Sequence, residues 1–133
     1  MPNRFYPAFK DALLSGDADL ADGAVTAVLV DTAGYAFNAA HDALDDIPAG
    51  ARIGTPQVLA GKTIASGTLN AEDVTFPNVP AGGTIGGLVI YIAGSSEATS
   101  RLVAFFDTID GLPVAPNGGD IEVAWDDAGI LYV

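Results

Sequence analysis

The run LVIYI, residues 88–92, is the stretch of sequence that decides the fold class of this chain. Five apolar residues in a row, three of them β-branched, predict a strand that is covered on both faces. The run AVTAVLVD at 24–31 predicts a second buried strand for the same reason. The stretch DIEVAW at 120–125 instead alternates, which places Ile121, Val123 and Trp125 on one face of a strand. These patterns predict a protein built mainly of β-strands.

Short strands and turns account for the whole chain from residue 52 onward. Strands are predicted over 55–64, 73–76, 87–93, 101–107, 120–125 and 129–133. Turns rich in Gly, Pro and Asn separate them, as in NVPAGG at 78–83 and PNGG at 116–119. Many short strands with dense Gly and Pro favour an antiparallel β-sandwich or a small barrel.

The N-terminal third predicts one or two short helices instead. The first covers residues 5–14, where Phe5, Phe9 and Leu13 recur at a spacing of four residues. Pro7 lies in its first turn, where the missing N–H costs little, and Gly16 offers a left-handed stop. We therefore predict that Phe5, Phe9 and Leu13 face the core or a neighbouring subunit.

A second helix is predicted over residues 38–46. Asn38 is a suitable N-cap, the alanines that follow favour the helical state, and Pro48 stops the helix. The chain has neither a linker nor a repeat of fixed period, and 133 residues suit one domain. We expect one domain over residues 1–133, with an arm and helix at 1–16 and a β-rich core at 24–133.

Acidic residues dominate the charge of the chain. The sequence has 5 basic and 17 acidic residues, which gives a net charge of −12. Between Lys10 and Arg52 there is no Lys or Arg, but there are eight aspartates: Asp11, Asp17, Asp19, Asp22, Asp31, Asp42, Asp45 and Asp46. Such a chain should be repelled by nucleic acids and by anionic membranes. Two interpretations stay open: a solvated acidic surface, or a surface complementary to a basic partner or to divalent cations.

Composition also excludes several classes of protein. There is no cysteine, so neither a disulfide framework nor a thiolate zinc site is possible. No stretch approaches the roughly 18 apolar residues of a membrane span. An acidic residue and polar residues stand where the apolar core of a signal peptide would lie, so we expect no secretion by that route.

No set of residues forms a convincing catalytic or metal-binding motif. His41 is the only histidine, and it lacks the neighbouring nucleophile and positioned acid of a triad. Asp17, Asp19 and Asp22 fail the EF-hand pattern, because the third acid is one residue late and Val28 stands at position 12. A looser site of oxygen ligands in this loop stays open.

Other patterns have simpler explanations than chemistry. The adjacent pairs Asp45/Asp46 and Asp126/Asp127 are typical of solvated turns rather than of a glycosidase. The stretch GGTIGG at 82–87 lacks the Lys-Ser/Thr ending of a phosphate loop and precedes a strand. Trp125, Tyr91 and Tyr132 offer a platform for stacking sugars, but the shared phase of Trp125 with Ile121 and Val123 favours core packing. We therefore predict no catalytic residue, cofactor or metal.

Four stretches resemble a family of small structural proteins that tailed bacteriophages encode. They are YPAFKDALLSGDADL at 6–20, AVTAVLVDTAGY at 24–35, AAHDALDDIPAGARI at 39–53 and EATSRLVAFFDTIDGLPVAPNGGDIEVAWDD at 97–127. The last includes the GLPV-x-PNGGD loop and the Trp-Asp strand of the family's C-terminal half. The resemblance covers most of the chain and lies in the order of these phrases rather than in a catalytic motif.

The resemblance implies a non-enzymatic role in the virion, as a head decoration, head fibre or minor tail protein. The expected partners are the major capsid protein, other virion proteins and further copies of the chain, after assembly in the host cytoplasm. Arms and exposed strand edges commonly join such domains into assemblies. The alternative is a receptor- or glycan-binding module that is displayed on the particle and binds through Tyr35, Tyr91 or Trp125.

Overall fold

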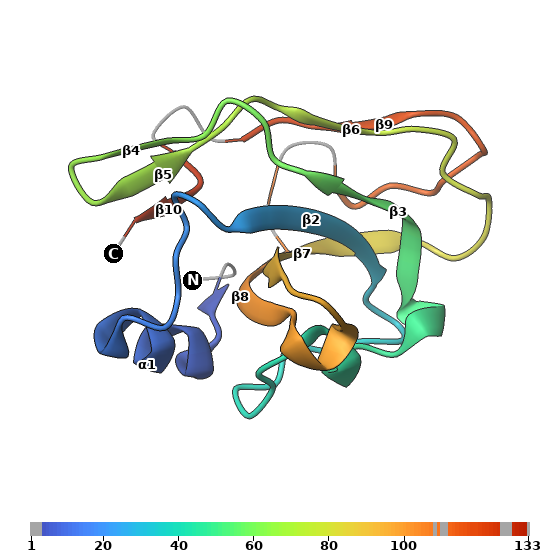
Figure 1. The fold of residues 1–133 in the computed structure, drawn as a ribbon. Helices are drawn as coiled ribbons and strands as arrows, with labels where there is room; N and C mark the ends of the chain where they lie inside the picture. Colours follow the sequence, from blue (N-terminus) through green and yellow to red (C-terminus); the bar gives the residue numbers. More distant parts are fainter. Residues whose placement is uncertain (1–3, 108, 110–111, 126–128, 133) are drawn as a thin grey trace.

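A five-stranded antiparallel sheet is the central element of the computed structural model, which describes residues 4–107, 109, 112–125 and 129–132. The strand order is β1-β8-β7-β2-β3 (Figure 1). Their bounds are Arg4–Phe5 for β1, Arg101–Phe106 for β8, Ile85–Ala93 for β7, Ala24–Asp31 for β2 and Arg52–Val58 for β3. The mainly β fold predicted from the sequence is thus confirmed.

The two longest strands, β2 and β7, lie at the centre of this sheet and are covered on both faces. They pair antiparallel over their whole length, with Val28 opposite Val89. Along β2, Ala27 and Leu29 pack into one apolar cluster, while Val28 and Val30 pack into another. Successive side chains of a strand point to opposite faces, so a sheet with two covered faces needs the continuous apolar runs that the sequence shows.

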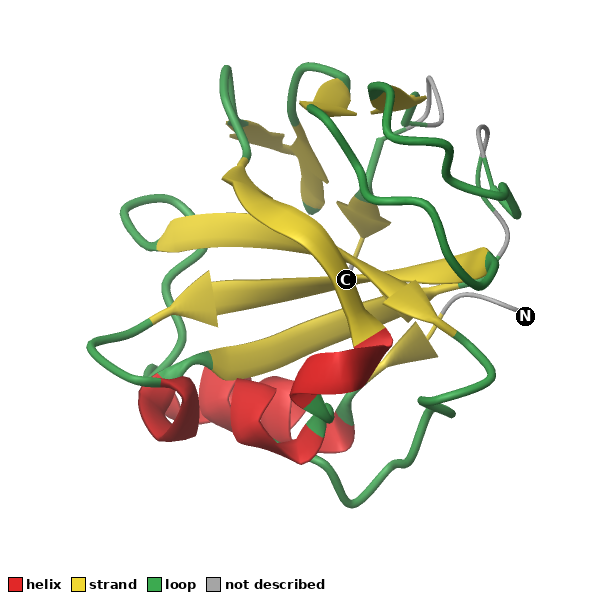
Figure 2. Ribbon diagram, turned by 90° about the vertical axis from the view of Figure 1, so that its right-hand side faces the viewer, coloured by secondary structure: helices red, strands yellow, loops and turns green. Residues whose placement is uncertain are grey.

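Two small antiparallel sheets cover one face of the large sheet (Figure 2). One has the order β10-β5-β4 and the other pairs β6 with β9. Their bounds are Thr63–Ala65 for β4, Thr68–Asn70 for β5, Val74–Phe76 for β6, Ile121–Val123 for β9 and Leu131–Tyr132 for β10. Leu69, Phe76 and Val123 of these sheets are buried in the main cluster with Leu29 and Ile90 of the large sheet. The result is a layered, sandwich-like β domain.

Three 3-10 turns lie on the other face of the large sheet, two of them packed in the second cluster, and helix α1, Pro7–Ser15, lies near them in Figure 2 but buries Phe9 in the main cluster. The turns are η1 Leu44–Asp46, η2 Ala49–Ala51 and η3 Glu97–Thr99. Helix α1 confirms the first predicted helix: Pro7 begins it, and Gly16 ends it at φ 82° with its N–H directed to the last carbonyls. Among the described residues, no helix has the length and apolar character needed to cross a membrane.

The second predicted helix, at residues 38–46, is wrong. Only Leu44–Asp46 forms a 3-10 turn, and the residues before it pair with the edge of β8. The N–H of Leu44 donates to Ser100 O (2.8 Å), and that of Leu102 donates to Asp42 O (3.1 Å). Asp46 Oδ2 also accepts from the N–H of Asp42 (2.8 Å). Such local carboxylate contacts compete with a helix, and the pairing with β8 outweighs the weak preference of the alanines.

Strand boundaries also differ from the prediction in places. The strand expected at 55–64 begins at Arg52 and is divided into β3 and β4 by a turn. Strands β1 and β5 were not predicted, because two or three residues carry no periodicity. The predicted strands at 73–76, 87–93, 101–107 and 120–125 correspond to β6, β7, β8 and β9 with ends shifted by one to two residues.

Candidate functional site

An open pocket of about 340 Å³ lies where β1, the segment after β2 and the end of β8 meet. Its walls include Arg4, Thr32, Tyr35, Phe37, Phe105 and Asp107. The turn after β2 directs this segment inward, because the N–H groups of Gly34 and Tyr35 both donate to Asp31 O. The pocket therefore combines aromatic rings with one basic and one acidic side chain.

Aromatic rings form much of the pocket wall. The guanidinium carbon of Arg4 lies 4.9 Å from the centre of the Phe37 ring, within the range of a cation–π contact. The Phe105 ring centre lies 6.0 Å from Phe37 and 6.1 Å from Tyr35. Because Arg4 pairs with Phe105 across β1 and β8, the N-terminal arm itself builds one side of the pocket.

Behind the pocket, three side chains form a hydrogen-bonded chain. The hydroxyl oxygens of Tyr6 and Tyr35 are 2.6 Å apart, and the Tyr35 hydroxyl lies 3.0 Å from Nδ1 of His41. Burial raises the pKa of both tyrosine hydroxyls, so they stay neutral. His41 belongs to the helix predicted over 38–46, but it is not helical: it is half-buried and forms the outer end of this polar chain.

The carboxylate of Asp46 lies close to this chain. Backbone N–H groups of Asp42 and Ala43 donate to its Oδ2 (2.8 and 3.3 Å). These donors, that of Asp42 first, hold the pKa of the Asp46 carboxyl below its usual range. Asp46 therefore remains ionised at neutral pH and serves mainly to fix the fold of residues 42–46.

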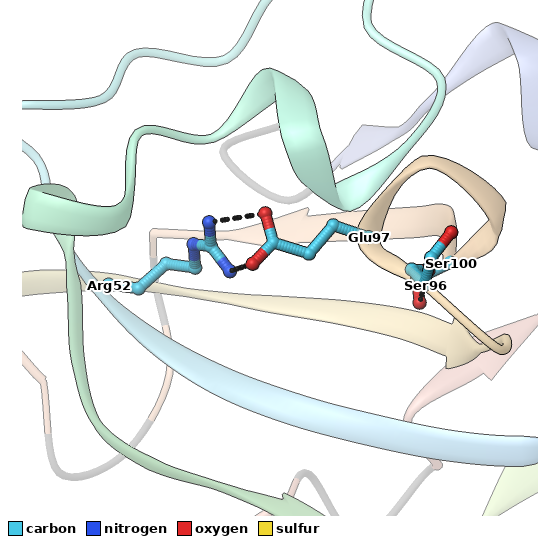
Figure 3. A network of polar contacts seen from close by, with 4 residues as sticks. All are labelled: Arg52, Ser96, Glu97 and Ser100. Carbon is cyan, nitrogen blue, oxygen red and sulfur yellow. Dashed lines mark hydrogen bonds and ion pairs between the residues drawn. The ribbon is translucent and has the colours of Figure 1, made fainter.

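A separate polar network ties β3 to the connection between β7 and β8 (Figure 3). Arg52 and Glu97 point toward one another and form a two-point ion pair, Nη1 to Oε2 at 3.1 Å and Nη2 to Oε1 at 2.9 Å. Ser100 Oγ donates to Ser96 O (2.8 Å) and accepts from the N–H of Gly94 (3.0 Å). These contacts hold two connections of the sheet together, which is a structural task.

Phe5, Phe9 and Leu13 lie toward the protein's own core. Phe9 is completely buried in the main cluster, and its ring stacks on Phe5 at a centroid distance of 5.8 Å. Phe5 and Leu13 are partly buried against the same cluster, while Leu14 is 88 % exposed. Phe9 is thus placed as a core residue. Contact of Phe5 and Leu13 with a partner stays a prediction.

The residues suggested for sugar stacking are mostly in the interior. Trp125 is buried against Phe106, and its Nε1–H donates to Glu72 O (3.0 Å). Tyr91 is buried, and burial raises its pKa. Tyr35 alone of the three candidates for the displayed module lines the pocket. The side chain of Tyr132 lies outside the described residues, as do Asp126 and Asp127.

The aspartates of the 16–23 loop stabilise turns rather than gather around a point. Asp19 Oδ1 accepts from the N–H groups of Ala21 and Asp22 (2.9 and 3.0 Å), and Asp17 accepts from Ser15. Lys62 Nζ holds the loop by donating to Leu20 O (3.1 Å) and Gly23 O (2.7 Å). Within the described part of the chain, no three His, Asp or Glu side chains are arranged to bind a metal ion.

The chain matches no protein-family model and no curated protein. Of the pocket residues, the sequence had indicated Tyr35 only. Arg4, Phe37 and Phe105 carry no local signal, because they become neighbours through the pairing of β1 with β8 and the turn after β2.

Proposed function

We propose that this chain is a non-enzymatic structural protein of a tailed-bacteriophage virion, a capsid decoration or head-associated accessory protein. It stabilises the particle by contacts with the major capsid protein, other virion proteins or further copies of itself, after assembly in the host cytoplasm. The order of phrases over residues 6–53 and 97–127 supports the phage family. The layered β domain is compatible with a role that needs a rigid building block.

One structural observation carries the protein–protein role: two sheets end in strands with exposed apolar side chains. Strand β3 is an edge of the large sheet and β4 is an edge of a small one. Val58 at the end of β3 is 63 % exposed, and Ile64 in β4 is 52 % exposed. An open strand edge with apolar side chains favours pairing with another chain.

The charge distribution points to the same two strands. Residues 47–71, which include β3 and β4, contain no Asp or Glu, although the whole chain carries −12. Copies of a strongly acidic protein approach one another with least repulsion where acids are missing. We therefore infer that the edges of β3 and β4 form the contact surface in the particle.

Purified particles test the proposal. The protein should be present in a fixed ratio to the major capsid protein, and the double variant Val58→Asp/Ile64→Asp should fold normally but fail to be incorporated. Each single variant, Val58→Asp and Ile64→Asp, is compared with Thr75→Asp as the matched control, because Thr75 is an exposed residue of β6 and gains the same single charge without loss of an apolar contact. Absence of the protein from particles, or normal incorporation of the double variant, would contradict the proposal.

The pocket favours a second function, a module that binds glycans on the particle surface. The partly exposed ring of Phe37 beside the charged groups of Arg4 and Asp107 suits the apolar and polar faces of a sugar, whereas the rings of Tyr35 and Phe105 are buried. Titration of the purified chain with mono- and oligosaccharides should then shift NMR signals of Thr32 and Phe37 but not those of Thr75. A displayed module would also be scarcer on the particle than a decoration protein. If no sugar shifts these signals, this function is excluded in favour of the first.

A further inference from the structure

The N-terminal arm, residues 4–6, lies along the outer edge of β8, where Tyr6 is fully buried and its ring centre lies 4.9 Å from that of Phe37. Arg4 pairs with Phe105 and Phe5 with Ala104, and the N–H of Tyr6 donates to Val103 O (3.0 Å). Farther along the same edge, residues 42–44 take over the pairing at Leu102 and Ser100. Two short segments thus complete this edge, and the chain of Tyr6, Tyr35 and His41 links their side chains.

Proton counting fixes the direction of that chain. It contains two hydrogen bonds and two hydroxyl protons, one on Tyr6 and one on Tyr35. Both bonds are filled when Tyr6 donates to Tyr35 and Tyr35 donates to an unprotonated Nδ1 of His41. Since Tyr6 is fully buried and its hydroxyl contacts only Tyr35 among the described residues, this arrangement satisfies every group.

When His41 is protonated, the donor protons of this chain outnumber its hydrogen bonds. The imidazolium carries a proton on Nδ1 and can only donate, so three donor protons compete for two hydrogen bonds. Tyr35 then accepts from His41 and donates to Tyr6, which reverses the chain. The Tyr6 O–H is left without an acceptor in a buried site, and such a group is costly to leave unpaired.

We propose that this chain of hydrogen bonds is an acid-sensitive latch, in which protonation of His41 loosens the N-terminal arm from the edge of β8. His41 is the only histidine of the sequence, and its imidazole is the one group of this chain of hydrogen bonds that can gain a donor proton. Opening of the arm exposes the backbone of Ala104 and Phe105 for pairing with another chain and removes Arg4 from the pocket.

The surrounding charges leave the proton count unchanged. Asp46 of η1 attracts the imidazolium, but its Oδ2 accepts from two backbone N–H groups and does not bond to Tyr6. Asp42 adjoins His41 in sequence, and Arg101 of β8 pairs with Ala43, two residues farther along. The pKa of Asp46 is lowered and those of Tyr6 and Tyr35 are raised, so these three groups keep their charge between pH 7.5 and 5.5.

Hydrogen exchange of the purified chain tests the latch. After correction for the intrinsic exchange rate, the protection factor of the Tyr6 amide should fall on the order of tenfold between about pH 7.5 and 5.5. The amide of Val28 in central β2 should keep its protection and thus report that the fold is intact. Two variants should abolish the pH dependence at Tyr6. His41→Gln removes the imidazole, and Tyr35→Phe keeps the imidazole but removes the hydroxyl that joins it to Tyr6.

Each outcome decides the question. A constant protection factor at Tyr6 in the unaltered protein would overturn the latch. In that case Tyr6 would keep its hydrogen bond to Tyr35, the Tyr35 O–H would be the group without an acceptor, and the arm would stay in place. An equal fall in Tyr35→Phe would also overturn it, since His41 would act on the arm by another route. The test needs neither the particle nor a sugar, so its failure leaves the proposed function untouched.

Discussion

Replacement of Phe9 by alanine probes how far helix α1 belongs to the core. The ring is 0 % exposed, stacks on Phe5 and lies in the main apolar cluster. Phe→Ala at such a site costs about 3–5 kcal/mol, from lost burial and from the cavity that remains. For a domain of this length each kcal/mol lowers Tm by about 3–5 °C, so we expect a fall of roughly 9–25 °C.

Thermal and urea unfolding of the purified variant measure this cost, with Leu14→Ala as the control in the same helix. Leu14 is 88 % exposed, and its replacement should change stability by less than about 0.5 kcal/mol. The Phe9→Ala loss should be the same at low and high protein concentration, because the ring is buried within its own chain. A loss below about 1 kcal/mol, or one that grows with protein concentration, would refute the assignment of Phe9 to the core.

Three further predictions concern the charged groups. Lys62→Met removes the ammonium from Leu20 O and Gly23 O and should cost about 1 kcal/mol in urea unfolding, with faster amide exchange in the 16–23 loop; unchanged exchange there would contradict it. The Arg52 guanidinium lowers the pKa of the Glu97 carboxyl, so the unaltered protein should be more stable than Glu97→Gln at neutral pH. This difference in stability should vanish as pH falls below the usual range of a glutamate, and unfolding of both proteins across pH measures it. On purified particles, rising salt should leave the protein attached. Release by moderate salt alone would indicate that the acidic surface docks on a basic one. Release by a chelator alone would indicate bound cations at the 16–23 loop.

The elements that the sequence predicts well are those whose own residues decide them. Strand β2 has the predicted bounds, because eight residues with a continuous apolar run leave few other ways to bury that surface. Helix α1 is similarly marked by Pro7, Gly16 and the spacing of its apolar residues. The placement of Trp125 in the core followed from its phase with Ile121 and Val123.

The elements that the sequence misses depend on partners far along the chain. Residues 38–46 contain good helix formers, but Asp42 and Leu44 bond to the edge of β8, almost sixty residues away. Strand β1 exists only because β8 offers that same edge, and the pocket exists only because β1 lies there. No local pattern encodes such contacts. For the same reason His41 gave no sign of its bond to Tyr35, since a lone histidine has no period or motif.

The use of the basic residues explains why we expect salt to have little effect on assembly. Arg52 is paired with Glu97, Lys62 binds two carbonyls, and Arg4 and Lys10 lie over aromatic rings of the same chain. These four cations contact groups of their own chain. The edges of β3 and β4 therefore offer a partner mainly backbone groups and the apolar side chains of Val58 and Ile64. Contacts of that kind are not screened by ions, whereas an acidic docking surface would be. Under the proposed function, the acids elsewhere would limit association to the edges of β3 and β4.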